Sequence, residues 1–157
     1  MNFFQAIKSC YTNWGFSKLR SSRTEFWYFF LFYYGFMFLT ALIIYSFQSI
    51  NSSEFQAEAE FPFSGMVFIF IFAIISALPF IAVTIRRLHD VNQSGYWILA
   101  ALILGGIARI QLPFFNPAGI LNLIINIIIL ALCTQKSYEK DNIYGKSINK
   151  KSRKKSS

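Results

Sequence analysis

Charged residues are scarce in this sequence. Only 14% of its 157 residues are charged, where a soluble domain carries about 25%, while 55% are hydrophobic and 19% aromatic. The apolar residues stand in long uninterrupted runs, whereas the amphipathic periods of a soluble core would interleave them with polar positions. The composition therefore favours a single membrane domain and leaves no room for a second, soluble one.

Ligating residues are scarce as well. Two cysteines, Cys10 and Cys133, are too few and too far apart for a disulfide framework or a metal knuckle. A single histidine, His89, rules out sites that need two histidine ligands, such as the HExxH helix of zinc proteases. We therefore expect neither a metal nor a cofactor.

Basic residues outnumber acidic ones by 15 to 7, which gives a formal charge of +8. A nucleic-acid binder would place this charge on the face of a soluble module beside aromatic or groove-reading elements. Here the aromatic residues lie in the apolar runs. We expect no nucleic-acid partner and interpret the charge as a sign of membrane topology and of attraction to anionic lipid headgroups.

Two apolar runs predict transmembrane helices. Residues 26–48 and 61–85 contain 23 and 25 positions without one charge, and each is long enough to cross about 30 Å of hydrocarbon as a helix. Pro79 is expected to kink the second helix, with Ser76 near enough to satisfy a freed carbonyl.

A third apolar region, residues 95–134, is 40 residues long and therefore exceeds one span. Two prolines and an asparagine near its centre predict a hairpin of short helices over residues 96–112 and 118–134. One long helix would hold Arg109 near mid-membrane at about 2.5–3.5 kcal/mol, whereas the hairpin lets it snorkel outward. One span plus a re-entrant segment is the remaining alternative.

The predicted fold is an all-α membrane helical bundle with four transmembrane helices over residues 26–134. Residues 1–25 are an amphipathic segment that begins with a short helix lying on the membrane. The face of this helix is formed by Phe3, Phe4, Ile7, Tyr11 and Trp14. Residues 135–157 are predicted to be a basic, disordered tail, because lysine and serine dominate its end.

The basic residues also predict the orientation. Residues 1–25, the loop after Ile85 and the tail after Thr134 hold 14 of the 15 lysines and arginines, while residues 49–60 hold none and carry three glutamates. The positive-inside rule therefore places both termini in the cytoplasm. The basic tail is then near an anionic lipid leaflet.

The densest polar segment is RRLHDVNQSGYW, residues 86–97. If the second long helix continues to Asp90, Arg86 and Asp90 lie four residues apart on one face, and Arg87 points elsewhere and is free to meet Glu25. The candidate cluster at this membrane face comprises Arg20, Arg23, Glu25, Arg86, Arg87, His89 and Asp90.

Two interpretations of this cluster remain open. As an ion-pair network it would fix the topology, with Trp27 and Trp97 as interfacial anchors. As an anion site, its arginine forks would bind a phosphate such as that of a lipid headgroup. The pair His89 and Asp90 is too little for a metal site or a general base, so we predict no catalytic residue and regard an enzyme as the least favoured class.

Small and amide side chains predict close helix packing within the membrane. Ala101, Gly105 and Ala108 form a stripe on one helix, and Asn122 and Asn126 form an amide pair on the next. Two alternatives remain for these faces. They could be the contact between copies in a homo-oligomer, or they could form the polar lining of a transporter or channel subunit. The sequence lacks the midplane carboxylate of proton-coupled carriers.

Three segments carry a family resemblance. SSRTEFWYF at residues 21–29, LPFIAVTIRRLHDVNQSGYW at 78–97 and NIYG at 142–145 resemble the YhaH/YhaI-like bacterial inner-membrane proteins, grouped as domain-of-unknown-function family 805. Besides the cluster, the motif positions are Ser94, Gly95, Trp97, Asn142, Tyr144 and Gly145. The resemblance implies a multi-pass protein of the bacterial cytoplasmic (inner) membrane, with no established activity and no active-site residues.

The expected function is non-enzymatic. The leading hypothesis is a small membrane protein whose cytoplasmic cluster binds an anionic lipid headgroup, a membrane protein partner or a second copy. The alternative hypothesis is a subunit of a small-solute transporter or channel.

Overall fold

The computed structural model describes residues 1–15, 20–51, 63–109, 117–145 and 147. These residues form five helices and no strand, which confirms the all-α class for the described part of the chain. In chain order the helices are α1 Phe3–Thr12, α2 Arg23–Asn51, α3 Phe63–Asp90, α4 Tyr96–Ala108 and α5 Pro117–Thr134.

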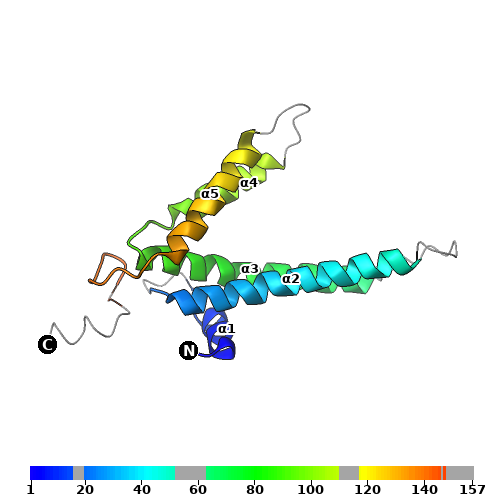
Figure 1. The fold of residues 1–157 in the computed structure, drawn as a ribbon, viewed down its shortest axis with the longest axis horizontal. Helices are drawn as coiled ribbons and strands as arrows, with labels where there is room; N and C mark the ends of the chain where they lie inside the picture. Colours follow the sequence, from blue (N-terminus) through cyan, green and yellow to red (C-terminus); the bar gives the residue numbers. More distant parts are fainter. Residues whose placement is uncertain (16–19, 52–62, 110–116, 146, 148–157) are drawn as a thin grey trace.

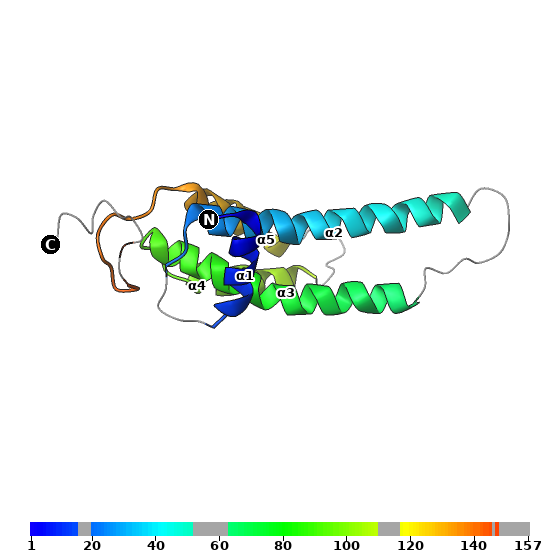
Figure 2. The ribbon, with the colours of Figure 1, turned by 90° about the horizontal axis from the view of Figure 1, so that it is seen from below.

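Helices α2 and α3 lie side by side as a long antiparallel hairpin (Figures 1 and 2). With 29 and 28 residues, they are about 43 Å and 42 Å long at 1.5 Å per residue. Their segments Arg23–Ser46 and Val67–Asp90 are long and apolar enough to cross a membrane. Both predicted spans are therefore confirmed as helices. Helix α3 continues to Asp90, as the predicted ion pair between α3 residues assumed.

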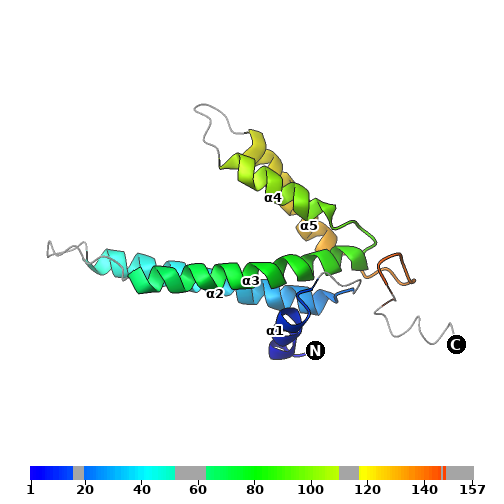
Figure 3. The same cartoon turned by 180° about the vertical axis from the view of Figure 1, so that it is seen from behind.

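Helices α4 and α5 form a second, shorter hairpin that diverges from the first (Figures 1 and 3). The 18 residues of α5 suffice for a span. Helix α4 has only 13 residues where 96–112 was predicted, and its length of about 20 Å falls short of a hydrocarbon layer of about 30 Å. Three spanning helices are thus supported by length and composition, and the fourth span stays a prediction, since residues 110–112 lie outside the described residues.

Pro79 lies inside α3 without ending it. The hydroxyl of Ser76 is 2.7 Å from that of Tyr11, which belongs to α1. This bond attaches α1 to the middle of α3, while the suggested bond from Ser76 to a carbonyl freed by the proline stays a prediction.

Helix α1 crosses α2 and α3 (Figure 2). Its innermost side chains are Ala6 and Cys10, both fully buried, whereas Phe4 and Trp14 are 81% and 54% exposed. The helix itself is confirmed. Ile7 and Tyr11 of the predicted face pack against the core together with Ala6 and Cys10, and the placement of the exposed Phe4 and Trp14 on a membrane stays a prediction.

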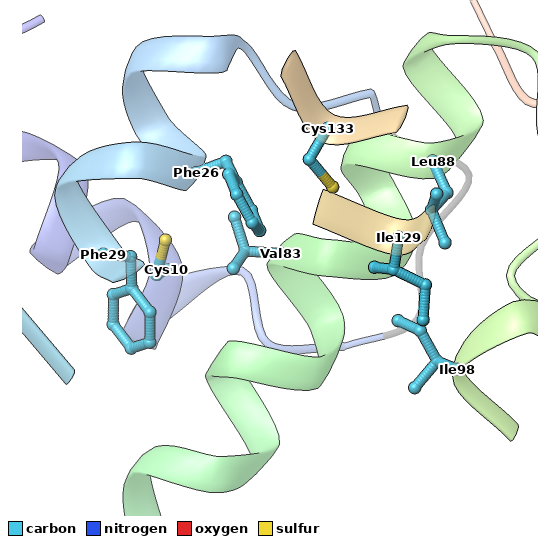
Figure 4. Packing of buried hydrophobic residues seen from close by; sticks show 8 residues of the cluster. All are labelled: Cys10, Phe26, Phe29, Val83, Leu88, Ile98, Ile129 and Cys133. Atoms are coloured by element: carbon cyan, nitrogen blue, oxygen red, sulfur yellow. The ribbon is translucent and has the colours of Figure 1, made fainter. Parts of the chain in front are cut away.

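The hydrophobic core lies at the end where all five helices meet, which we call the helix junction (Figure 4). Its buried members come from every helix and are Cys10, Phe26, Phe29, Val83, Leu88, Ile98, Ile129 and Cys133. Away from the junction the apolar side chains face outward; Leu31 is 63% exposed and Leu123 61%. Such all-round apolar faces are what lipid-contacting helices present.

Candidate functional site

A buried carboxylate bridges two arginines at the helix junction. Arg20 Nε lies 2.8 Å from Asp90 Oδ1, and Arg87 Nη1 donates to Asp90 Oδ2. All three side chains are 0% exposed. Because a buried charge is tolerated only when it is paired and hydrogen-bonded, these groups depend on one another.

A second ion pair joins Arg86 Nη1 to Glu25 Oε1 at 3.5 Å. The predicted pairing is therefore wrong in its detail, since Arg87 meets Asp90 and Arg86 meets Glu25. Residues three and four apart on a helix are both neighbours, so spacing alone did not decide between Arg86 and Arg87 as the partner of Asp90. The packing decides, because α1 and α2 cover the Arg86 side of α3 and the segment after α5 covers the other.

Backbone carbonyls after α5 complete the surroundings of the two bridged arginines. Arg87 donates to the carbonyls of Cys133, at 3.0 Å, and Gln135. Arg20 donates to the carbonyls of Lys140, at 2.9 Å, and Tyr138. Each guanidinium nitrogen of both arginines thus has an acceptor within the protein.

These contacts correct the expectation for the tail. Residues 135–145 fold against the junction, where the arginine side chains bind their carbonyls, so the expected disorder does not hold there. Residues 148–157 lie outside the described residues. The docking of this segment could not be predicted from its residues, because a backbone carbonyl is available at every position.

Glu25 fastens α1 to the start of α2. It accepts hydrogen bonds from the hydroxyls of Ser9 and Ser21, both at 2.8 Å. Burial raises the pKa of the nearby Cys10 thiol to about 12; the Glu25 carboxylate adds to this rise and Arg86 opposes it. Cys10 is therefore a neutral thiol at physiological pH.

Arg86 is less fully satisfied than the other arginines of the cluster. Its Nε and Nη2 atoms are buried and have no hydrogen-bond partner among the described residues, and the same is true of His89 Nδ1. Of the predicted cluster only Arg23 lies outside, with an exposed side chain.

A left-handed residue ends α3. Asn92 has φ 61°, its N–H donates to the carbonyl of His89 at 3.1 Å, and the N–H of Gln93 donates to that of Leu88 at 2.9 Å. This pair of bonds is the Schellman arrangement, and asparagine is the residue that adopts it most readily after glycine. It turns the chain toward α4.

The NIYG segment docks on this helix end. Asn142 and Gly145 pair as an isolated antiparallel bridge, and Gly145 has φ 143°, a value that favours glycine. The ring of Tyr144 stacks on His89 with centroids 3.9 Å apart and planes 2° from parallel, and Asn142 Nδ2 donates to the His89 carbonyl at 2.8 Å. Two of the motif segments are therefore in direct contact, although more than 50 residues separate them in the sequence.

The motif positions before α4 have structural roles. The hydroxyl of Ser94 accepts the N–H of the first α4 residue at 3.2 Å. A Cβ on Gly95 would lie 3.0 Å from Ile85 Cγ2 and 3.5 Å from His89 Nε2, so a larger residue there would have to displace the Ile85 side chain. Trp97 is half-buried against the core.

Helix α4 packs on α5, with Gly105 facing Asn122, whereas the bonds of the amide pair lie within α5. A Cβ on Gly105 would lie 3.2 Å from Asn122 Nδ2, and Asn126 Nδ2 donates to the Asn122 carbonyl and Oδ1 at 2.8 and 2.9 Å. Ala101 packs against the core, and Ala108 is half-buried at the end of α4.

A cleft of about 750 Å³ lies between the two hairpins. Aromatic side chains of α2 and α3 form one wall, and the small and polar side chains of α4 and α5 form the other. Arg109 caps the C-terminus of α4 and lines this cleft. Its snorkelling toward the membrane surface stays a prediction.

Long apolar helices meeting at a buried charge cluster define a helical membrane protein. Its sequence matches, over residues 15–146, the model of a family described as protein of unknown function (DUF805), and the chain belongs to that family. The resemblance noted from the motifs is thus confirmed. No curated protein and no solved structure matches the chain.

Within the described ranges, no three histidine, cysteine, aspartate or glutamate side chains are grouped so as to hold a metal ion. The acid–base candidate pair is also held in structural contacts, since Asp90 is shared by two arginines and His89 stacks on Tyr144. The buried ion pairs hold the helix ends together, and the exposed charged residues give the junction its surface charge.

Proposed function

We propose that this chain is a non-enzymatic, multi-pass protein of the bacterial cytoplasmic (inner) membrane whose helix junction lies at the cytoplasmic face and binds anionic lipid headgroups. The observation that carries the proposal is a division of charge. At the junction, Arg20 and Arg87 are buried and paired with Asp90, while other basic side chains around them are exposed.

Two of the three buried arginines that the structure describes, Arg20 and Arg87, are poor headgroup ligands. Every nitrogen of Arg20 and Arg87 already has a protein acceptor, and Asp90 places a negative charge beside both. A phosphate would have to displace these bonds and repel the carboxylate. Of the two interpretations of the cluster, the ion-pair network therefore has the stronger support.

The exposed basic residues are better ligands, and we call them the basic rim. They are Lys8, Arg23, Lys136 and Lys140. Two exposed carboxylates, Glu139 and Asp141, lie in the same segment as the last two, while residues 148–157 add five more basic residues and no acid to the sequence. Near an anionic leaflet each basic side chain contributes about 1 kcal/mol.

The hairpin geometry supports one orientation. The described parts of both chain ends, α1 and residues 135–145 with Ser147, lie at the helix junction (Figure 1). Positive charge is concentrated at this end, and the positive-inside rule assigns such an end to the cytoplasm.

The basic rim is tested by lipid retention. The combined variant Lys8→Gln, Arg23→Gln, Lys136→Gln and Lys140→Gln is purified from membranes, and the ratio of phosphatidylglycerol to phosphatidylethanolamine that stays bound is compared with wild type. We expect this ratio to fall severalfold and its salt dependence to weaken, because surface electrostatics dominate the binding.

The matched control is Glu139→Gln, which removes an exposed carboxylate from the same segment and should raise the ratio slightly. An unchanged phosphatidylglycerol enrichment in the combined variant, at an unchanged unfolding midpoint, would refute the proposal.

A second candidate function is a subunit of a small-solute transporter or channel, in which several copies of the chain would assemble. The polar residues Arg109, Asn122 and Asn126 on the cleft wall favour it. Solute flux into proteoliposomes, abolished by Asn122→Leu with Asn126→Leu, would support this candidate, and its absence for every tested solute would leave lipid binding as the better proposal.

A further inference from the structure

The cleft between the hairpins has an apolar wall and a polar end. Phe30, Tyr33 and Phe80 belong to the wall contributed by α2 and α3, and Leu102 lies across from them on α4. Its volume of about 750 Å³ falls within the range of about 300–1,000 Å³ that small-molecule sites occupy. Both hairpins diverge from the junction (Figures 1 and 3).

Arg109 is the single charged residue of the apolar region 95–134, and a charge within such a region needs a partner. It follows the 13 residues of α4, which is about 20 Å from the start of that helix and less than the thickness of a hydrocarbon layer. A charged side chain within the membrane marks a functional site by default, because leaving it unpaired costs about 2.5–3.5 kcal/mol on insertion scales.

The protein itself offers no counter-charge there. No aspartate or glutamate is among the described residues that line the cleft. The apolar runs 26–48, 61–85 and 95–134 contain no acidic residue at all, so a second copy of the chain would bring no carboxylate to this depth either. Asn122 and Asn126 add their uncharged amides to the lining on the same side of the cleft.

We infer that the cleft binds one anionic phospholipid of the bilayer, with its phosphate at the Arg109 guanidinium and the Asn122 amide and an acyl chain along the aromatic wall. A guanidinium and amide N–H groups are suitable donors to a phosphate. A water-soluble anion would leave the aromatic wall without an apolar partner. A zwitterionic lipid would bring a positive group close to Arg109, so a net negative headgroup is preferred.

Two neighbouring glycines provide a way to fill the cleft. A Cβ on Gly106 meets nothing within 4 Å, whereas one on Gly105 meets Asn122 at 3.2 Å. Both residues line the cleft. A leucine at 106 therefore takes space from the ligand without disturbing the packing of α4 on α5.

The test is a titration of the full chain in detergent with phosphatidylglycerol or phosphatidylcholine of identical acyl chains, followed by native mass spectrometry. Wild type should prefer phosphatidylglycerol by about tenfold, the factor expected of one charge-assisted contact. Arg109→Gln should reduce the preference to less than about twofold, and Arg109→Lys should restore part of it. Gly106→Leu should weaken binding of both lipids.

Arg23→Gln, in the basic rim, is the matched control and should leave the preference at the cleft unchanged, so failure of the cleft and failure of the rim are distinguishable. A full phosphatidylglycerol preference in Arg109→Gln, or unaltered lipid binding in Gly106→Leu, would overturn the inference. Equal unfolding midpoints show that both variants are folded.

Discussion

At the scale of single residues, Asp90 has the most interdependent position in the junction. Its carboxylate is shared by Arg20 and Arg87, and its backbone carbonyl accepts from Arg20 Nη2 and from the N–H of Tyr138. The end of α3, the residues before α2 and the segment after α5 therefore converge on one amino acid.

Replacing this carboxylate should destabilise the protein strongly. Asp90→Asn removes one negative charge and leaves two buried guanidiniums facing a neutral amide, so we expect the free energy of unfolding to fall by about 3–5 kcal/mol. Denaturant titration in micelles measures this. The control Glu139→Gln, at an exposed position, should stay within about 0.5 kcal/mol of wild type, and an equally small effect of Asp90→Asn would contradict the ion-pair interpretation.

Most members of the cluster could be predicted from the sequence, but their pairing could not. Arginines and carboxylates are rare near apolar runs, which makes them conspicuous. Whether Arg86 or Arg87 meets Asp90 depends on what covers each side of α3, and the carbonyls that receive Arg20 and Arg87 have no side-chain signature. Ser21 was a missed partner with a weak signal, since it lies four residues before Glu25.

At the scale of elements, helix existence follows from apolar length, and helix ends follow from local chemistry. At the junction α2 begins before its predicted run and α3 ends after its own. The added turns hold Glu25, Arg86, Arg87 and Asp90, which are in ion pairs. Helix α1 docks on α2 and α3 through Ala6 and Cys10 as well as through Ile7 and Tyr11 of its predicted apolar face.

The reactivity of the Cys10 thiol measures whether α1 is docked on α2 and α3. In a Cys133→Ser background we expect Cys10 to react with a maleimide far more slowly than an exposed thiol, because it is 0% exposed and its pKa is raised to about 12. Tyr11→Phe, which deletes the bond to Ser76, should accelerate labelling severalfold through local opening, since one hydrogen bond is worth about 1 kcal/mol.

The pH dependence of this reaction has a definite sign. Only the thiolate reacts, so in the folded protein the rate of Cys10 labelling should keep rising with pH up to about 12, while a free cysteine levels off above its usual pKa of about 8.5. Labelling of wild-type Cys10 as fast as an exposed cysteine at neutral pH would show that α1 is not docked.

At the scale of the whole molecule, two hairpins share one junction and diverge from it. The hairpins themselves are predictable from the order of apolar runs and turns. The angle between them is not, because it depends on the packing of Ile98 and Ile129 in the junction core and on the cleft beyond it. The short α4 places Arg109 on that cleft, a position that hydropathy alone did not indicate.

The most direct test of the account is the side of the membrane on which the junction lies. In a Cys10→Ser, Cys133→Ser background, single cysteines are introduced by Ser53→Cys, in the acidic loop, and Lys140→Cys, in the basic rim. With a membrane-impermeant maleimide, the account predicts that intact cells label Ser53→Cys, while Lys140→Cys reacts only after permeabilisation. Labelling of Lys140→Cys in intact cells, or recovery of the protein in the soluble fraction without detergent, would contradict it.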